Sequence, residues 1–237
     1  MENKTARVRR ALPRRRRRLR PNQNLRPRAF RADRAHVVAA VILSAGESSR
    51  MGSPKALVPF RGTTFLGHLL EVIHQSKKNA ESGKEIGCTR VILGAHTEEI
   101  TAKIPLDHSA IVLNPQWQQG QLSSIKEAIR SLKEVQTDGI ILFLVDHPLV
   151  SAELVSELVH QFYASGRSIV LPKFRGKRGH PVIFAARLYA ELLAAPAEQG
   201  ARAVVWAHPD EILEVPTNEE GVVLNLNDPE ALRRALT

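Results

Sequence analysis

Two uninterrupted apolar segments, residues 37–43 and 139–145, constrain the fold of this chain more than any other feature. A strand with one face in water alternates apolar and polar side chains, whereas a strand covered on both faces is apolar throughout. Both segments are therefore predicted to be central strands of a parallel sheet. Each run has seven residues, far below the roughly 20 residues of a membrane-spanning helix, so we expect no membrane span.

Strand and helix patterns alternate along the rest of the chain. Further strand patterns lie at residues 88–93, 111–113, 168–171 and 222–226. Helical spacing of apolar residues is found within 65–73, 122–132 and 154–162. Asp228 followed by Pro229 predicts the N-cap and first position of a last helix. The order of elements predicts an α/β sandwich with a mostly parallel sheet.

The positive charge of the chain is concentrated in residues 1–36. That segment has 14 Lys/Arg and 2 Asp/Glu, whereas residues 37–237 have 20 Lys/Arg and 22 Asp/Glu. Apolar residues are too sparse there to form a core, so we expect a disordered Arg-rich tail and one folded domain, residues 37–237. Three interpretations of the tail stay open: binding of nucleic acid or another polyanion, a secretion signal, or an unselected extension from a start codon set too early.

Cysteine and aromatic content limits the function of the folded part. Cys88 is the only cysteine, which excludes an internal disulfide and a Cys-rich zinc site and favours a cytoplasmic, reducing setting. With a net charge of −2 and two Trp and two Tyr in the whole chain, the body is a poor candidate for nucleic-acid binding. Nucleic acid is therefore expected to bind only through the tail, if at all.

A polar loop follows the first apolar segment. It contains two glycines, two serines and two cations: Gly46, Gly52, Ser48, Ser49, Arg50 and Lys55. Glycines let the backbone approach a ligand, and amides with hydroxyls and fixed cations after a buried strand suit an oligophosphate. The spacing is not that of a Walker A loop, a dinucleotide fingerprint or a hydrolase elbow. A solvated connection with incidental charges is the alternative.

Three other segments carry candidate chemistry. Asp146 follows the second apolar segment, at the sheet edge where a carboxylate and substrate phosphates can hold Mg²⁺, although it could instead cap the turn before Pro148. Ser123 and Ser124 open an amphipathic helix, and N-capping is the simple interpretation of both residues. Residues 174–184 gather cations and glycines, as in an anion site or an exposed basic hairpin.

Residues 43–55 resemble the L-x-A-G-x-S-x-R-M-G-x-x-K signature of the MobA-like nucleotidyltransferases, the family that includes molybdenum-cofactor cytidylyl- and guanylyltransferases. The resemblance extends over the body through D-x-P, N-x-x-W-x-x-G-x-x-S-S, R-G-H-P-V, G-A-R and N-x-N segments at residues 146–148, 114–124, 178–182, 200–202 and 225–227. It implies a Rossmann-like three-layer α/β/α sandwich of the nucleotide-diphospho-sugar transferase type.

The resemblance also implies roles for individual residues. Arg50, Lys55 and Asp146 would be catalytic, with Mg²⁺ held by Asp146 and by Asn227 or Asn225. The residues implied at the nucleotide are Leu43, Ser44, Ala45, Gly46, Arg50, Gly52, Lys55, Gly120 and Ser124. The acceptor-side candidates are Arg178, His180 and Arg202. His147 stands where the cytidylyl branch has Gln, and we do not take it as a base.

The implied reaction is transfer of CMP from CTP to the terminal phosphate of molybdopterin, with release of pyrophosphate. A molybdoenzyme or its chaperone is the implied protein partner. The alternatives are guanylyl transfer to the same acceptor, and cytidylyl or uridylyl transfer to a sugar or alditol phosphate. From other classes, the chain could bind polyanions through residues 1–36, or bind a nucleotide without catalysis.

Overall fold

The computed structural model of the chain describes residues 36–49, 51–79 and 84–236. The basic tail and Arg50 lie outside the described residues, so the interpretations of the tail and the role expected of Arg50 remain predictions. Within the described ranges, no helix is long and apolar enough to cross a membrane.

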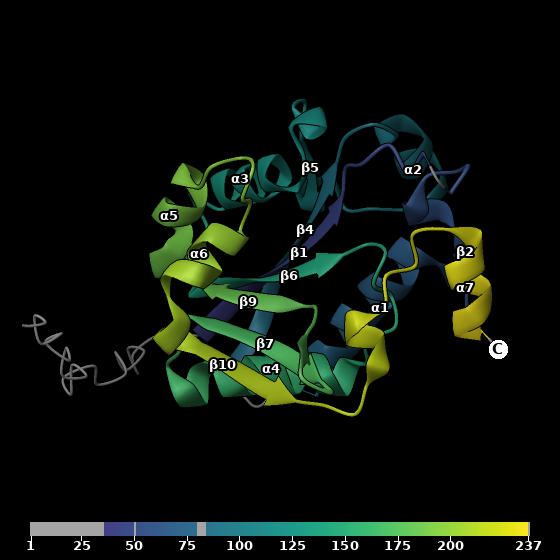
Figure 1. Cartoon of the computed structure of the whole chain (residues 1–237). Coiled ribbons are helices and arrows are strands. Elements are labelled where there is room, and N and C mark those ends of the chain that lie inside the picture. The colour runs from purple at the N-terminus through teal and green to yellow at the C-terminus, as the bar shows by residue number, and fades with distance from the viewer. Residues whose placement is uncertain (1–35, 50, 80–83, 237) are drawn as a thin grey trace, which may run out of the picture.

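A single large sheet runs through the molecule in the order β10-β7-β9-β6-β1-β4-β5, with β8 paired to β7 (Figure 1). Its strands are β1 (His36–Ser44), β4 (Lys84–Leu93), β5 (Ile111–Leu113), β6 (Gly139–Leu144), β7 (Ile169–Phe174), β8 (Lys177–Arg178), β9 (Val182–Ala185) and β10 (Ile212–Pro216). The pairs β1/β4, β1/β6, β4/β5 and β7/β10 are parallel, whereas β9 is antiparallel to β6 and β7. The mostly parallel sheet predicted from the sequence is confirmed.

Helices cover both faces of this sheet and complete three layers (Figure 1). One face packs against α1 (Phe65–Lys78), α2 (Thr97–Lys103) and α4 (Ala152–Ser165). The other packs against α3 (Gln121–Ser131), α5 (Tyr189–Ala194) and α6 (Arg202–Ala207). The last helix, α7 (Pro229–Leu236), lies beside the first group, near the small hairpin of β2 (Pro59–Phe60) and β3 (Thr63–Thr64). The chain thus has the expected α/β/α architecture.

Strand β1 is apolar because it contributes to both cores. Val38, Ala40 and Ile42 belong to the core under α1 and α4, and the residues between them belong to the core under α3. Every side chain from Val38 to Ile42 is 0% exposed. A polar side chain at any of these positions would be buried without water, which explains the uninterrupted run.

The carboxyl ends of β1 and β6 meet at the point where the chain reverses direction across the sheet. From β1 the chain proceeds to β4 and β5 on one side, and then crosses to β6 on the other side. Leu43 pairs with Leu144, and the Val145 amide donates to the Leu43 carbonyl at 3.2 Å. The loops after β1 and β6 therefore leave the sheet side by side, where α/β sheets commonly bind ligands.

The prediction of a strand at residues 222–226 is wrong. Residues Glu220–Val223 form a 3-10 helix, and the last strand of the sheet is β10, which ends before this segment begins. Val222 and Leu226 are buried, but their segment bonds to loops: the Val222 carbonyl accepts from the His180 amide, and the Leu226 amide donates to the Asp146 carbonyl. Apolar residues at alternate positions, Val222, Leu224 and Leu226, therefore resemble a strand pattern without forming a ladder.

The predicted start of the last helix is confirmed, because Asp228 Oδ1 accepts from the Ala231 amide at 2.8 Å. Strands β9 and β10 were not predicted. Strand β10 is a half-buried edge strand with Glu214 in its middle and Pro216 at its end, which is a weak strand signal although both residues suit an edge.

Gly221 and Gly179 determine how closely this irregular C-terminal segment docks. A Cβ at Gly221 would lie 2.0 Å from the Leu149 carbonyl oxygen, and one at Gly179 would lie 2.5 Å from the Val222 carbonyl oxygen. Both neighbours are backbone atoms that cannot rotate away, so only glycine fits.

We expect Gly221→Ala to lower the free energy of unfolding by about 1–3 kcal/mol, the usual cost of overpacking. Gly46→Ala is the matched control, because no atom lies within 4 Å of its added Cβ and its φ is ordinary. Urea unfolding of both variants checks the expectation, and equal midpoints would contradict it.

Candidate functional site

The loop after β1 is shaped by Ser48 and Gly52, both of which have positive φ. Ser48 Oγ accepts from the Lys55 amide at 3.0 Å, and the Ser48 carbonyl accepts from the Met51 amide at 2.9 Å. The hydroxyl oxygen expected to face a ligand thus also organises the loop. It places Lys55 at the start of a 3-10 helix, Lys55–Leu57.

Lys55 meets Asp146 and Asn227 where three distant segments of the chain converge. Lys55 Nζ donates to Asp146 Oδ2 at 2.7 Å and also to Asn227 Oδ1. The Lys55 and Asp146 side chains are each 16% exposed, so the ion pair is strongly shielded from water. Asn225 is exposed and makes none of these contacts among the described residues, which favours Asn227 over Asn225 as the partner of Asp146.

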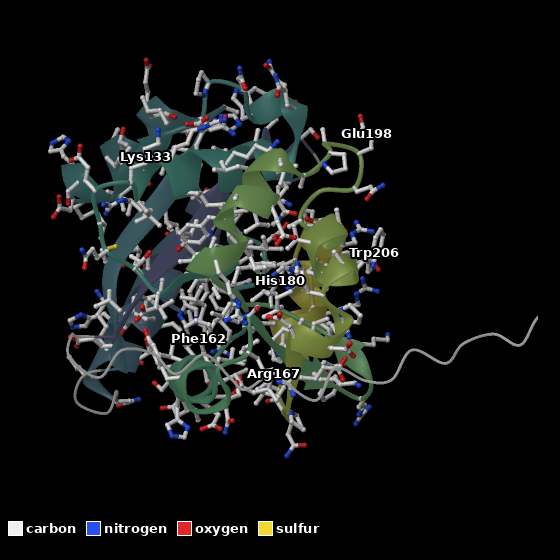
Figure 2. All side chains as sticks on the ribbon, turned by 90° about the vertical axis from the view of Figure 1, so that its left-hand side faces the viewer. Lys133, Phe162, Arg167, His180, Glu198 and Trp206 are labelled. Carbon is white, nitrogen blue, oxygen red and sulfur yellow. The ribbon has the colours of Figure 1, made fainter. Side chains whose placement is uncertain are left out.

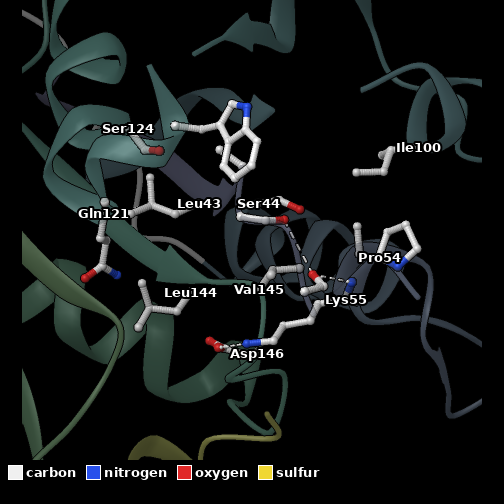
Figure 3. A pocket seen from close by; sticks show the side chains of 16 residues that line it. Leu43, Ser44, Pro54, Lys55, Ile100, Gln121, Ser124, Leu144, Val145 and Asp146 are labelled. Atoms are coloured by element: carbon white, nitrogen blue, oxygen red, sulfur yellow. Dashed lines mark hydrogen bonds and ion pairs between the residues drawn. The ribbon is translucent and has the colours of Figure 1, made fainter. Parts of the chain in front are cut away.

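A cavity of about 230 Å³ opens beside this ion pair (Figure 3). The residues expected at the nucleotide that line it are Leu43, Ser44, Ala45, Gly46, Lys55, Gly120 and Ser124. Gly52 is not among its lining residues. The loop after β1, the start of α3 and the end of β6 therefore share one cavity, as the sequence predicted.

Other side chains of the cavity wall were missed by sequence reasoning. Trp117 lines it from the 3-10 helix Trp117–Gln119, Gln121 from the start of α3, and Ile100 from α2. The position of Trp117 and Gln121 within the segment that ends at Ser124 was an available signal. No sequence signal indicated Ile100, because it is one apolar residue of an ordinary helix.

The interpretation of Ser123 and Ser124 as N-caps is wrong. The N-cap of α3 is Gly120, whose φ is 89°, and both serines lie inside the first turn. They point back toward Asn114, whose amide nitrogen donates to Ser123 Oγ at 2.8 Å and to Ser124 Oγ at 2.9 Å. All three residues are buried, so this is an internal polar network at the cavity wall.

A second cavity, of about 550 Å³, lies on the side of α5 and α6. All three residues expected on the acceptor side, Arg178, His180 and Arg202, line it. Gln121 lines both cavities, so the two adjoin at the start of α3. Figure 2 shows His180 toward the interior and Trp206, a further lining residue, toward the periphery.

The guanidinium of Arg178 already forms an ion pair within the protein. Arg178 Nε donates to Glu214 Oε1 at 2.7 Å, and Lys173 also pairs with Glu214. Hydrogen bonds from Lys173 and Arg178 lower the pKa of Glu214, which stays ionised at neutral pH. Arg202 is exposed at the start of α6 and is the freer cation of the cavity.

The ring of His180 packs against that of His147, with 5.2 Å between the ring centroids and 59° between the ring planes. Burial lowers the pKa of His147, and it lowers the pKa of His180 to about 4. Both imidazoles are therefore neutral at pH 7. In the described part of the chain, neither Nδ1 has a hydrogen-bond partner. The pair contributes no positive charge to the second cavity, and no sequence pattern indicated that the two residues meet.

Comparison with known proteins identifies relatives over most of the body. The chain is 32% identical over 163 residues to Nicotine blue oxidoreductase of Paenarthrobacter nicotinovorans, covering 64% of this chain and 72% of the relative. It is 25% identical to the Molybdenum cofactor cytidylyltransferase of Escherichia coli, covering 81% of this chain and 92% of the relative.

Comparison with solved structures agrees with the comparison of sequences. The crystal structure of Rv0371c from Mycobacterium tuberculosis superposes with a TM-score of 0.70 and 25% identity, covering 84% of this chain and 97% of that one. The family model for the MobA-like NTP transferase domain matches residues 40–212, which include the second half of β1, the loop after it, Asp146 and all the residues that line the two cavities. The chain therefore belongs to the MobA-like NTP transferase family.

Proposed function

We propose that this chain transfers CMP from CTP onto the terminal phosphate of molybdopterin. The observation that carries the proposal is the convergence of Lys55, Asp146 and Asn227 beside a cavity walled by a glycine-bearing loop. Membership of the family supports nucleotidyl transfer, and similarity to a cytidylyltransferase of the molybdenum cofactor supports this donor and acceptor. The second cavity is then the acceptor's place.

The donor atoms at the convergence fit a divalent cation. Asp146 Oδ2 and Asn227 Oδ1 face the same positive charge, the Lys55 ammonium. Within the described residues no group of three or more His, Cys, Asp or Glu is placed to hold a metal. The two oxygens of Asp146 and Asn227 suit Mg²⁺, which takes one or two protein oxygens and completes its shell with phosphates and water. When bound, Mg²⁺ supplies neutralisation of polyphosphate charge.

The residues of the chain then act by positioning and by charge. An oxygen of the acceptor phosphate attacks the α-phosphorus, the bond from that phosphorus to the β-phosphate oxygen breaks, and pyrophosphate leaves with the electron pair. A phosphomonoester is mostly dianionic at pH 7, so no residue must remove a proton. Lys55, released from Asp146, would hold a phosphate oxygen. The lowered pKa values of His147 and His180 make both imidazoles weak proton acceptors, in keeping with a site that needs no base.

The second cavity offers contacts suited to a planar, anionic acceptor. Trp206 is 62% exposed at its rim, and Arg202 lies one helical turn earlier on α6. An exposed indole next to a guanidinium can stack on a heterocycle and pair with an anion. A flexible sugar or alditol phosphate would use the arginine but gain less from the indole.

Pyrophosphate release tests the proposed function. The protein is incubated with Mg²⁺ and each of the four nucleoside triphosphates, with and without molybdopterin. We expect release with CTP that requires the acceptor. A redox reaction, as the name of the Paenarthrobacter relative suggests for that protein, releases no pyrophosphate. Absence of release with every triphosphate would overturn the proposal.

Asp146→Asn and Asn227→Ala should each lower turnover by about 100-fold or more, because each removes an oxygen that holds charge in the transition state. Asn225→Ala is the matched control, since Asn225 is exposed and two residues away. Turnover is measured at saturating CTP and Mg²⁺, with circular dichroism to verify folding. Equal losses in the Asn225 and Asn227 variants would contradict the assignment.

Lys55→Met should raise the KM for nucleotide and lower kcat still more. Loss of a charge-assisted contact costs about 1.5–3 kcal/mol, a roughly 10- to 150-fold effect. We expect kcat to fall because the ammonium matters most as charge moves onto leaving pyrophosphate. Lys103→Met, at an exposed lysine paired only with Glu99 among the described residues, should behave like the parent. Parent-like kinetics for Lys55→Met would remove Lys55 from the site.

Trp206→Ala should raise the KM for molybdopterin about 5- to 150-fold, the range for one lost aromatic stack of about 1–3 kcal/mol. The KM for CTP should stay unchanged, because Trp206 lines only the second of the two cavities. Leu113→Ala is the control, since Leu113 is also a large exposed apolar residue, 59% exposed on edge strand β5. An effect on CTP rather than on the acceptor would contradict the division of the site.

A further inference from the structure

Asn114 has a fixed set of hydrogen-bond partners. The residue follows β5, is 1% exposed, and sits behind the first turn of α3. Its Oδ1 accepts from the Gln116 amide at 2.9 Å, and its Nδ2 donates to Ser123 Oγ at 2.8 Å and Ser124 Oγ at 2.9 Å. The orientation of the Asn114 amide is dictated by Gln116, because a backbone N–H can only donate and must face the oxygen.

This orientation determines what each serine hydroxyl can do. Both serine oxygens accept from Asn114, so each hydroxyl has its proton left to donate. Ser123 donates that proton to the Gly120 carbonyl at 2.7 Å. The Ser124 hydroxyl has no acceptor among the residues that the structure describes, and Ser124 lines the first cavity. Its proton is thus available to a ligand in that cavity.

Ser124 lies at the end of the first cavity where we expect the base of a bound nucleotide. Figure 3 shows Ser124 across the cavity from Lys55 and Asp146. With the polyphosphate at Lys55, as in the proposed function, the base extends toward Ser124. A fixed donor there favours a base edge that presents acceptors. On its Watson–Crick edge cytosine presents two neighbouring acceptors, O2 and N3, whereas guanine presents one acceptor, O6, and two neighbouring N–H donors.

We propose that Asn114 is a positioning residue that sets the base preference by holding Ser124 as a hydrogen-bond donor. Asn114 touches no substrate and acts through Ser124. This inference rests on the proposed function, because it needs a nucleotide in the first cavity. Its substrate class is a nucleoside triphosphate whose base presents a neighbouring carbonyl oxygen and unprotonated ring nitrogen on its Watson–Crick edge, as cytosine does.

Asn114→Asp reverses the polarity of this network with almost no change of shape. A carboxylate only accepts, so both serines would donate to the introduced carboxylate, and Ser124 would offer the cavity only lone pairs. We expect CTP affinity relative to GTP to fall about 2- to 12-fold, the range for one neutral hydrogen bond. Ser124→Ala should cause a similar fall without any change of charge.

The experiment measures dissociation constants by calorimetry for CTP, GTP and inorganic tripolyphosphate, all with Mg²⁺. Tripolyphosphate has no base, so Ser124→Ala should leave its affinity unchanged. The double variant Asn114→Asp/Ser124→Ala should be no worse for CTP than either single variant, because the two residues act as one unit. Ser123→Ala is the matched control: its proton is already used by Gly120, and it should keep the CTP-to-GTP preference.

The outcomes separate this inference from the function on which it rests. A parent that binds none of the triphosphates overturns both. A parent that binds CTP, together with an unaltered CTP-to-GTP preference in Asn114→Asp or additive losses in the double variant, overturns only the role of Asn114. If Asn114→Asp does not fold, Ser124→Ala still decides, because parent-like CTP affinity in that variant overturns the proposal.

Discussion

The parallel pairing of β1 with β6, both covered on two faces, is the constraint on which the rest of this structure depends. Because the two strands run in the same direction and in register, with Leu43 opposite Leu144, their loops must emerge at one point of one edge. The chain leaves β1 toward β4 on one side and leaves β6 toward β7 and β9 on the other, so the loops diverge and leave a crevice. Residues 91 positions apart, Lys55 and Asp146, are brought within 2.7 Å by this arrangement.

The ion pair between Lys55 and Asp146 in that crevice has two roles. It satisfies two charges that would otherwise lie unpaired in a poorly hydrated place, and breaking such a pair on one side is costly. The same two oxygens that receive the Lys55 ammonium, on Asp146 and Asn227, are those suited to a metal ion. A ligand that brings its own cations and phosphates offers replacements for every partner that the pair would lose.

Sequence analysis identified the strands that are buried on both faces, but it missed the segments and contacts that irregular loop backbone creates. The strands β1 and β6 were recognisable because two-sided burial leaves an unbroken apolar run, and the loop after β1 because its glycines and cations serve no core. The segment at 222–226 was misassigned because its apolar residues Val222, Leu224 and Leu226 stand at alternate positions, as in a strand, although the segment begins in a 3-10 helix. The contact between His147 and His180 is set by packing between distant loops, which no local pattern encodes.

The antiparallel strand β9 has a consequence for the order in which the molecule can be built. Strands β1, β4, β5 and β6 are neighbours and are all synthesised before residue 145, so half of the sheet can assemble while the remainder is still being made. Until β9 arrives, the β6 side of that half-sheet is an open edge that can pair with another chain. Strand β9 seals it and joins β7 and β10 to the sheet, and only afterwards does the segment bearing Asn227 settle over Asp146. Nascent chains halted before β9 are thus the stage most exposed to edge-to-edge aggregation.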